Sequence, residues 1–293
     1  MPAETVQIST RDGHALVARV YAPAGVVQRA VLIGAAMGVP QRFYEAFATW
    51  LSHQGVGVMT FDWRGTGESA PRRLRGFKAS ITDWAAKDLP AVVDAFCARW
   101  PDAPKTYLGH SLGGQLFGWL DQPERFERVL SVASGNGYWR LNAPQVRMQA
   151  PLLWWVLAPV GIGLAGYFPG KKLGAVGDLP AAAMWQWRKW CLHPDYLGSE
   201  GAAVRARYAS VQVPITAVVL EDDELVSPAG IRKLYQLYEK APVHFEHLHP
   251  HQMGMKRIGH FGLFKASSAE RLWPLALGWL QGEPTQGKRE PAP

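Results

Sequence analysis

A serine framed by glycines is the feature of this sequence with the clearest chemical meaning. Residues 109–113 read GHSLG, with Gly109 two positions before Ser111 and Gly113 two positions after it. An apolar run precedes this pentapeptide and a helical pattern follows, so Ser111 lies at a strand-to-helix turn. Small flanking residues let the strand and the helix cross closely, and the turn presents the hydroxyl and the N–H of Leu112 to the same space. We interpret Ser111 as a nucleophile.

A serine hydroxyl is a weak nucleophile and needs a base, which in turn needs an acid to orient it. His260 lies in a glycine-flanked loop, RIGHFGLFK (257–265), just before the last predicted helix. Four acidic residues follow the apolar run that ends near residue 220, and the end of that run favours Asp222 or Asp223 over Glu221 and Glu224. The chain order of serine, acid and histidine is that of a known type of catalytic triad.

Acyl transfer also needs backbone N–H groups that bind the developing oxyanion, each worth about 10²–10³ in rate. Leu112 supplies one, because it directly follows the nucleophile. The second is expected in the loop after the third strand, IGAAMGVPQ (33–41), with Ala36 as the first choice and Met37 as the second. A loop of this composition would equally serve to connect a strand to a helix, and it can do both.

Metal chemistry has a weaker basis in the sequence. His247, His249 and His251 alternate as metal ligands on one strand face would, but Pro250 interrupts the strand and no carboxylate spacing supports them. We therefore expect no metal and no cofactor. His110 is read as the variable position of the pentapeptide, and four other histidines are read as surface residues: His14, His53, His193 and His244.

The elements around these residues alternate between buried strands and amphipathic helices, which predicts an α/β fold with a mostly parallel central sheet flanked by helices. Asp12-Gly13 marks a hairpin between the first two strands, and Pro90 a bend within a helix. Strands are predicted at 6–10, 15–23, 30–36, 56–62, 105–110, 128–135, 214–222 and 243–248. Helices are predicted at 40–55, 81–101, 112–121, 230–240 and 270–282.

The alternation stops between residues 136 and 210, where the sequence is rich in tryptophan and proline. We expect a core of residues 1–135 and 211–283, an inserted helical cap (136–210) and a disordered tail (284–293). The tryptophans of such a cap can pack on the core and line an apolar pocket. The expected pocket residues are Met37, Trp139, Trp154, Trp155 and Trp187.

Residues 148–170 carry no charge, and their length invites a membrane-spanning interpretation. Three prolines and four glycines argue against a straight span. The stronger objection is that Ser111 precedes the stretch while the acid and His260 follow it, so one crossing would separate the triad. Peripheral contact of the cap with lipid stays open as an expectation.

Bulk composition narrows the remaining choices. The 48% hydrophobic content of 293 residues supports a large core, and two cysteines, Cys97 and Cys191, favour reduced thiols over a disulfide framework. Residues 1–10 lack the pattern of a signal peptide, so we expect a cytoplasmic protein. The net charge of +7 is partly due to PRRLRGFK (71–78), read as a solvated loop. No nucleic-acid-binding motif accompanies it.

These motifs together resemble the α/β-hydrolase superfamily over roughly residues 5–282. The combination of GVPQRFY, FDWRGTGES, DDELVSP and IGHFGLF is similar to uncharacterised bacterial α/β hydrolases near the serine aminopeptidase-like branch. The resemblance implies structural roles for Asp62, Arg64 and Gly65 in the turn after the fourth strand.

The resemblance also bears on the two open choices. The family places its acid three residues before a Val-Pro-like pair, and Val226 before Ser227-Pro228 selects Asp223 over Asp222. After the third strand the family's usual His-Gly is replaced by Gly34-Ala35, so the resemblance identifies the oxyanion loop without choosing its residue.

The function expected from the sequence is serine hydrolysis of a carboxylic ester with an apolar or aromatic acyl group. Ser111 would attack, His260 would transfer the proton, Asp223 would hold the imidazole, and Leu112 and Ala36 would bind the oxyanion. One alternative is a thioesterase or acyltransferase acting on a phosphorylated carrier near Arg72, Arg73 and Arg75. Another is a ligand-binding relative without catalysis. The oligomeric state is left open.

Overall fold

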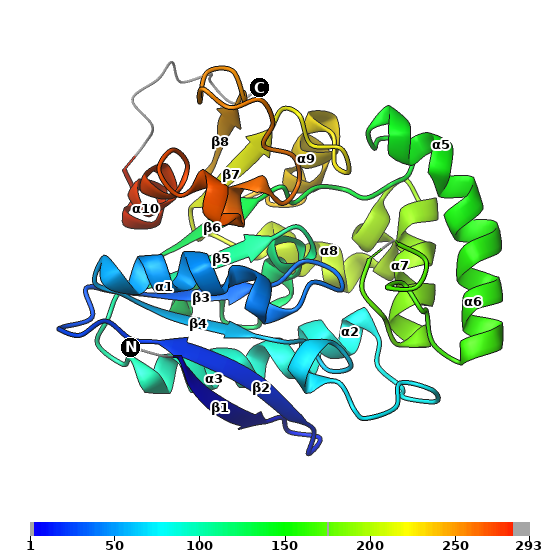
Figure 1. The fold of residues 1–293 in the computed structure, drawn as a ribbon, viewed down its shortest axis with the longest axis horizontal. Helices are drawn as coiled ribbons and strands as arrows, with labels where there is room; N and C mark the ends of the chain where they lie inside the picture. Colours follow the sequence, from blue (N-terminus) through cyan, green and yellow to red (C-terminus); the bar gives the residue numbers. More distant parts are fainter. Residues whose placement is uncertain (1–2, 175, 284–293) are drawn as a thin grey trace.

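A single eight-stranded sheet runs through the centre of the molecule in the order β1-β2-β4-β3-β5-β6-β7-β8 (Figure 1). This computed structural model describes residues 3–174 and 176–283, so the predicted tail (284–293) lies outside the described residues. The pairs β1–β2 and β2–β4 are antiparallel, and the pairs from β4 through β8 are parallel. The predicted α/β architecture is confirmed. The strands are β1 (Glu4–Ser9), β2 (Ala15–Tyr21), β3 (Arg29–Gly34), β4 (Val56–Phe61), β5 (Lys105–His110), β6 (Arg128–Val132), β7 (Ile215–Leu220) and β8 (Val243–Leu248).

The burial of the strands explains their pairing. Every residue of β4 is buried, and β3 is buried after its first residue, as expected of parallel strands covered on both faces. The hairpin strand β1 is mostly exposed, and its turn contains Gly13 at a φ of 78°. The continuous apolar runs therefore form the centre of the sheet, and the alternating run forms its edge.

Helices cover both faces of the sheet. Phe47 of α1 and Trp279 of α10 belong to one buried cluster with Val31 of β3. Phe96 of α3 and Leu234 of α9 belong to a second cluster on the opposite face. The α-helices outside the segment between β6 and β7 are α1 (Glu45–His53), α2 (Ile81–Asp83), α3 (Leu89–Arg99), α4 (Leu112–Gln115), α9 (Pro228–Tyr235) and α10 (Trp273–Gln281).

The chain between β6 and β7, which we call the cap (136–210), is helical. In Figure 1 its helices α5, α6 and α7 stand at one end of the sheet. The Tyr196 hydroxyl donates to the Gln115 side chain at 3.0 Å, just after β5 ends. Gly177 lies against Gly38, in the loop after β3, and a Cβ on Gly38 would be 2.8 Å from its nitrogen. The cap thus packs over the carboxyl edge of the sheet. Its helices are α5 (Pro144–Leu152), α6 (Ala158–Ala165), α7 (Ala181–Leu192) and α8 (Ala202–Ser210).

Pro151 and Pro159 of the uncharged stretch lie within one continuous helix, which a π-turn makes irregular. A π-turn, Leu153–Leu157, joins α5 to α6, so the chain is helical from Pro144 to Ala165. Pro159 follows directly after this π-turn, an irregularity of the kind that accommodates a proline within a continuous helix. By length and composition alone this stretch could cross a membrane, with a mean hydropathy of 1.4, and 17% of it is buried. Strands before and after it share one sheet, which a crossing would divide.

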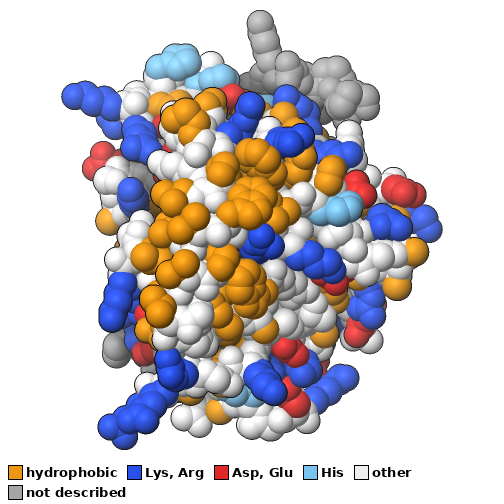
Figure 2. All heavy atoms as spheres, turned by 90° about the vertical axis from the view of Figure 1, so that its right-hand side faces the viewer, with side chains coloured by type: hydrophobic (Ala, Val, Ile, Leu, Met, Phe, Trp, Pro, Cys, Tyr) orange, Lys and Arg blue, Asp and Glu red, His pale blue; other side chains and the backbone are white. Residues whose placement is uncertain are grey.

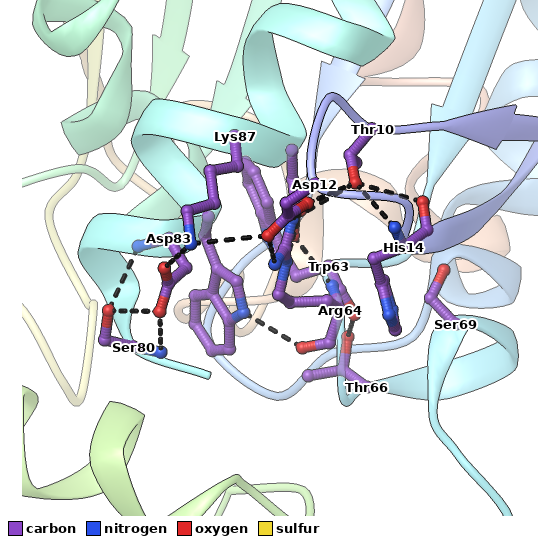
Figure 3. Close-up of polar contacts among 12 residues, drawn as sticks. Thr10, Asp12, His14, Trp63, Arg64, Thr66, Ser69, Ser80, Asp83 and Lys87 are labelled. Carbon is purple, nitrogen blue, oxygen red and sulfur yellow. Dashed lines mark hydrogen bonds and ion pairs between the residues drawn. The ribbon is translucent and has the colours of Figure 1, made fainter. Parts of the chain in front are cut away.

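A buried guanidinium holds the hairpin and the turn after β4 together (Figure 3). Arg64 Nε lies 2.6 Å from Asp88 Oδ1, and the two Nη atoms of Arg64 lie 2.7 and 3.0 Å from the Asp12 carboxylate. Lys87 adds an ion pair to Asp12 at 3.3 Å. The neighbouring Asp62 accepts hydrogen bonds from the backbone at Gln41 and Glu68, both 2.8 Å long. These contacts are internal to the fold and shape the turn beside the oxyanion loop.

Candidate active site

Ser111 occupies a strained turn between β5 and α4. Its φ of 52° and ψ of −117° are unusual for a residue with a side chain, and such strain costs about 1–3 kcal/mol. A Cβ on Gly109 would lie 2.2 Å from the Cα of Gly114, and one on Gly113 would lie 2.0 Å from the carbonyl oxygen of Gly34. The glycines at 109 and 113 therefore let β5, α4 and β3 approach closely enough to hold the serine in this turn.

Gly114 also has a specific role that the pentapeptide does not predict. A Cβ there would lie 2.2 Å from Ser134 Oγ and 2.3 Å from Ser131 Oγ. The third glycine thus permits close packing of α4 on β6, in addition to the crossing with β5.

Asp223 faces the catalytic candidate histidine. Its Oδ2 lies 2.7 Å from Nδ1 of His260, and both side chains are buried. Its other oxygen accepts hydrogen bonds from the N–H groups of Leu225 and Val226 at 2.7 and 2.9 Å. The carboxylate is therefore fixed in place from one side and holds the imidazole from the other.

The two flanking acids hold the backbone of the histidine loop instead. Asp222 accepts from the N–H groups of Ile258 and Gly259 at 2.8 and 3.0 Å. Glu224 accepts from the N–H of His260 at 3.0 Å. Burial raises the pKa of Glu224, but its own backbone N–H, the N–H of His260 and the Arg257 guanidinium outweigh burial and lower this pKa overall. Three successive carboxylates thus position one loop, and only the middle one contacts the imidazole.

His110, which the sequence pattern treats as a variable position, is fully buried behind Ser111. Its Nδ1 lies 2.8 Å from the Tyr44 hydroxyl, and its Nε2 lies 3.0 Å from the carbonyl oxygen of His260. Burial, together with the nearby His260, lowers the pKa of His110 well below its ordinary value. The residue before the candidate nucleophile therefore forms a hydrogen bond with the backbone of the candidate base.

This contact brings the predicted triad residues into one place. The rings of His110 and His260 have centroids 5.1 Å apart, and Ser111 directly follows His110. Ser111 is half-buried, and within the described residues neither its hydroxyl nor Nε2 of His260 has a hydrogen-bond partner. Such bonds are often long in structures without substrate.

The oxyanion candidates differ in what their N–H groups do. The Ala36 N–H donates to the Tyr44 hydroxyl at 3.0 Å, so this amide already has an acceptor within the protein. Among the described residues, the N–H groups of Leu112 and Met37 have no acceptor in the protein. The geometry therefore disfavours Ala36, our first choice, and leaves Met37, the second, available.

The predicted pocket residues separate into two groups. Trp154 is buried and packs edge-to-face with Trp187, with centroids 5.1 Å apart. Trp139 packs edge-to-face with Trp155, but Trp155 is 51% exposed on the outside of the cap. Met37 is buried in the oxyanion loop. Trp155 is thus about half exposed to solvent rather than enclosed in the interior of the cap.

The remaining candidates have structural contacts. His247 pairs with Glu221 at 2.5 Å, and no metal-binding group of three ligand side chains occurs in the described part of the chain. Arg75 of the basic stretch donates to the carbonyl groups of Leu164 and Ala165, at the end of α6. Cys97 and Cys191 are free thiols.

Comparison with known proteins identifies the family and the fold. The family model described as serine aminopeptidase, S33, matches residues 16–162, just over half of the chain. A monoglyceride lipase variant from Saccharomyces cerevisiae has a similar structure, with a TM-score of 0.65 and 15% identity over 98% of this chain and 97% of that one. An esterase from Pyrococcus furiosus has a TM-score of 0.63 and 15% identity over 96% and 91%. A thioesterase domain from the curacin biosynthetic pathway has a TM-score of 0.57 and 17% identity over 94% and 100%. At these identities, the solved structures show a shared fold.

Proposed function

Because the chain belongs to the serine aminopeptidase, S33, family of α/β hydrolases, we propose that it is a serine hydrolase that cleaves a carboxylic ester. The observation that carries the proposal is the buried pair of His260 and Asp223, 2.7 Å apart, joined through His110 to the turn that presents Ser111. The proposed nucleophile, base and orienting acid come from three loops at one edge of the sheet, which supports the proposal.

The proposed reaction begins with attack of Ser111 Oγ on the acyl carbon while His260 Nε2 takes the hydroxyl proton. The tetrahedral intermediate collapses, the bond to the leaving oxygen breaks, and His260 returns the proton to the departing alcohol. Water then attacks the acyl-serine with His260 again as base, which releases the acid and restores the hydroxyl. Asp223 keeps Nδ1 protonated and stabilises the imidazolium.

We propose that the oxyanion is bound by the N–H groups of Leu112 and Met37. Support comes from their lack of protein acceptors among the described residues and from the engagement of Ala36 with Tyr44. Preorganised donors of this kind stabilise charge that develops in the transition state, about 10²–10³ in rate each. The acyl group is proposed to be apolar or aromatic, because Met37 and the tryptophan-rich cap cover this edge.

The test is a panel of p-nitrophenyl esters and matched thioesters of increasing acyl length, assayed with the natural sequence and with Ser111→Ala. We expect ester turnover that falls by about 10⁴-fold or more in the variant. A fluorophosphonate probe should label the natural protein and not the variant. Wild-type turnover in Ser111→Ala would contradict the mechanism. Faster turnover of thioesters than of esters would change the proposed substrate class from esters to thioesters. Failure of the probe to label Ser111 would favour a ligand-binding protein without catalysis.

A further inference from the structure

The outer side of the cap helix exposes a stripe of large apolar side chains. The outer stripe consists of Met148 (79% exposed), Leu152 (54%), Trp155 (51%), Val156 (47%), Val160 (54%) and Leu164 (75%). Figure 2, which looks onto the cap side of the molecule, shows hydrophobic side chains gathered over a broad area. Exposed apolar patches of this extent mark interaction sites, because single exposed residues are common but contiguous ones are not.

The π-turn between α5 and α6 keeps this stripe on one side. Five of its members are spaced by four residues, from Met148 to Leu164. At 3.6 residues per turn, each step of four drifts by about 40°, so a regular α-helix would rotate the last side chain about 160° from the first. The wider turn at Leu153–Leu157 accommodates an extra residue and reduces this drift. The stripe is therefore a product of the irregular helix.

Charge on this part of the cap is predominantly basic, and the first acid that follows it in sequence, Asp178, lies 3.9 Å from the ammonium group of Lys171. Residues 128–177 contain no aspartate or glutamate, and within residues 136–177 the charged side chains are Arg140, Arg147, Lys171 and Lys172. Arg147 is exposed and adjoins Met148, and Lys171 and Lys172 are exposed beyond the end of α6. Figure 2 shows Lys and Arg side chains within and around the hydrophobic area. A protein partner with a hydrophobic surface would not by itself account for this charge asymmetry.

Two tryptophans and an arginine form the polar side of the stripe. The Arg188 guanidinium lies 5.8 Å from the ring centroid of Trp155 and 5.8 Å from that of Trp185, which is 40% exposed. Arg188 Nε also donates to the Trp154 carbonyl at 2.7 Å, so this arrangement is fixed to the helix backbone. Amphipathic indole rings with adjacent cations suit the boundary between acyl chains and headgroups.

We propose that the outer stripe is a docking surface for an anionic lipid membrane. Pro144–Ala165 would lie in the plane of the interface, with its apolar side among the acyl chains and its basic residues against lipid headgroups. It would not span the bilayer, because strands on both sides of it in the sequence belong to one sheet. The fixed Arg75 contacts at the end of α6 hold the helix against the body of the protein in this orientation.

The experiment is flotation with vesicles of phosphatidylcholine alone or with about one third phosphatidylglycerol. The protein carries Ser111→Ala, so that lipid hydrolysis does not affect the readout and a failure of the proposed catalysis stays separate. We expect stronger binding to the anionic vesicles, and weaker binding when salt is raised to about 1 M. Arg147→Glu with Lys172→Glu should remove most of the preference for anionic lipid, and Lys171 is left unchanged because its ammonium group lies 3.9 Å from Asp178.

The stripe itself is tested by Leu152→Asp with Leu164→Asp, which should weaken vesicle binding about tenfold or more. Val26→Asp is the matched control, because Val26 is 88% exposed in the loop between β2 and β3. When Ser111 is restored, the stripe variant and the Val26→Asp control should each hydrolyse a soluble short-chain ester at the rate of the natural protein. This result would show that both variants are folded. No vesicle binding by the parent protein, or equal losses in stripe and control variants, would overturn the proposal. A dimer that dissociates only in the stripe variant, without vesicle binding, would instead assign the surface to a second copy of the chain.

Discussion

The hydroxyl of Tyr44 lies 2.8 Å from Nδ1 of His110, and both side chains are fully buried. The proton positions in this contact follow from its neighbours. The carbonyl oxygen of His260 can only accept, so Nε2 of His110 carries a proton, and Nδ1 of the neutral ring must accept from Tyr44. The Tyr44 oxygen in turn accepts the Ala36 N–H. One directed chain of hydrogen bonds thus links the oxyanion loop to the loop of the candidate base.

Tyr44→Phe should reduce turnover while it leaves substrate binding largely intact. The substitution removes the acceptor of Ala36 and the donor to His110, so it loosens both the oxyanion loop and the His260 loop. We expect kcat to fall about tenfold with little change in KM. Tyr238→Phe is the control, because that hydroxyl also accepts a backbone N–H, from Gly118, but lies outside this chain of hydrogen bonds. Equal effects of the two variants on kcat would contradict a positioning role.

His110 should make the protein less stable in mild acid. Burial lowers its pKa in the folded state well below the value of about 6.5 in an unfolded chain. The unfolded state therefore binds a proton below about pH 6.5 that the folded state does not, and stability falls as the pH drops through this window, by up to about 1.4 kcal/mol per pH unit.

This contribution is measured by urea unfolding of the natural protein and of His110→Asn between about pH 5 and pH 8. The variant should be less stable at pH 8, because it loses two buried hydrogen bonds. The difference between the two proteins should narrow as the pH falls. A constant difference across the range would show that His110 does not titrate on unfolding.

Asp223→Asn and Asp222→Asn should have different consequences, although the residues are adjacent. Asp223 contacts the imidazole, so its amide variant should lower kcat about 10⁴-fold while the fold is retained. Asp222 accepts two backbone N–H groups of the histidine loop, so its variant should mainly reduce stability and lower kcat less than about tenfold. Steady-state kinetics with unfolding curves for both proteins separate the roles, and a larger kinetic effect at Asp222 would reverse the assignment.

Arg64→Met should destabilise the fold strongly, since it leaves the buried Asp88 carboxylate without its cation. The loss of a partner from a buried ion pair costs about 3–5 kcal/mol in the free energy of unfolding. Arg125→Met provides the comparison, because the pair of Arg125 with Asp94 is largely exposed and worth at most about 1 kcal/mol. Denaturant unfolding of both variants gives the two values, and similar losses would mean that the buried network does not hold the hairpin and turn.

Local patterns were sufficient to predict the fold and the strained turn at Ser111. Buried strands such as β4 can be recognised as continuous apolar runs in the sequence, because a parallel strand covered on both faces must be apolar on both sides. The serine turn can be recognised in the sequence because glycine is the only residue type that the crossing of β5, α4 and β3 accommodates at positions 109 and 113. Backbone requirements of this kind restrict residue type at a known spacing, so they can be recognised without knowledge of distant contacts.

Tertiary structure decided the choices between neighbouring residues and the role of His110. Asp222 and Asp223, or Ala36 and Met37, have nearly the same sequence context, and a hydrogen bond to a distant segment distinguishes them. The partner of Ala36 is a phenol that also contacts His110, 66 residues away from Tyr44. The exposure of Trp155 likewise depends on a π-turn and on which side of α5–α6 meets the core. Periodicity predicts which side chains point to the same side of a helix or strand. Only the packing of remote segments determines which groups those side chains contact.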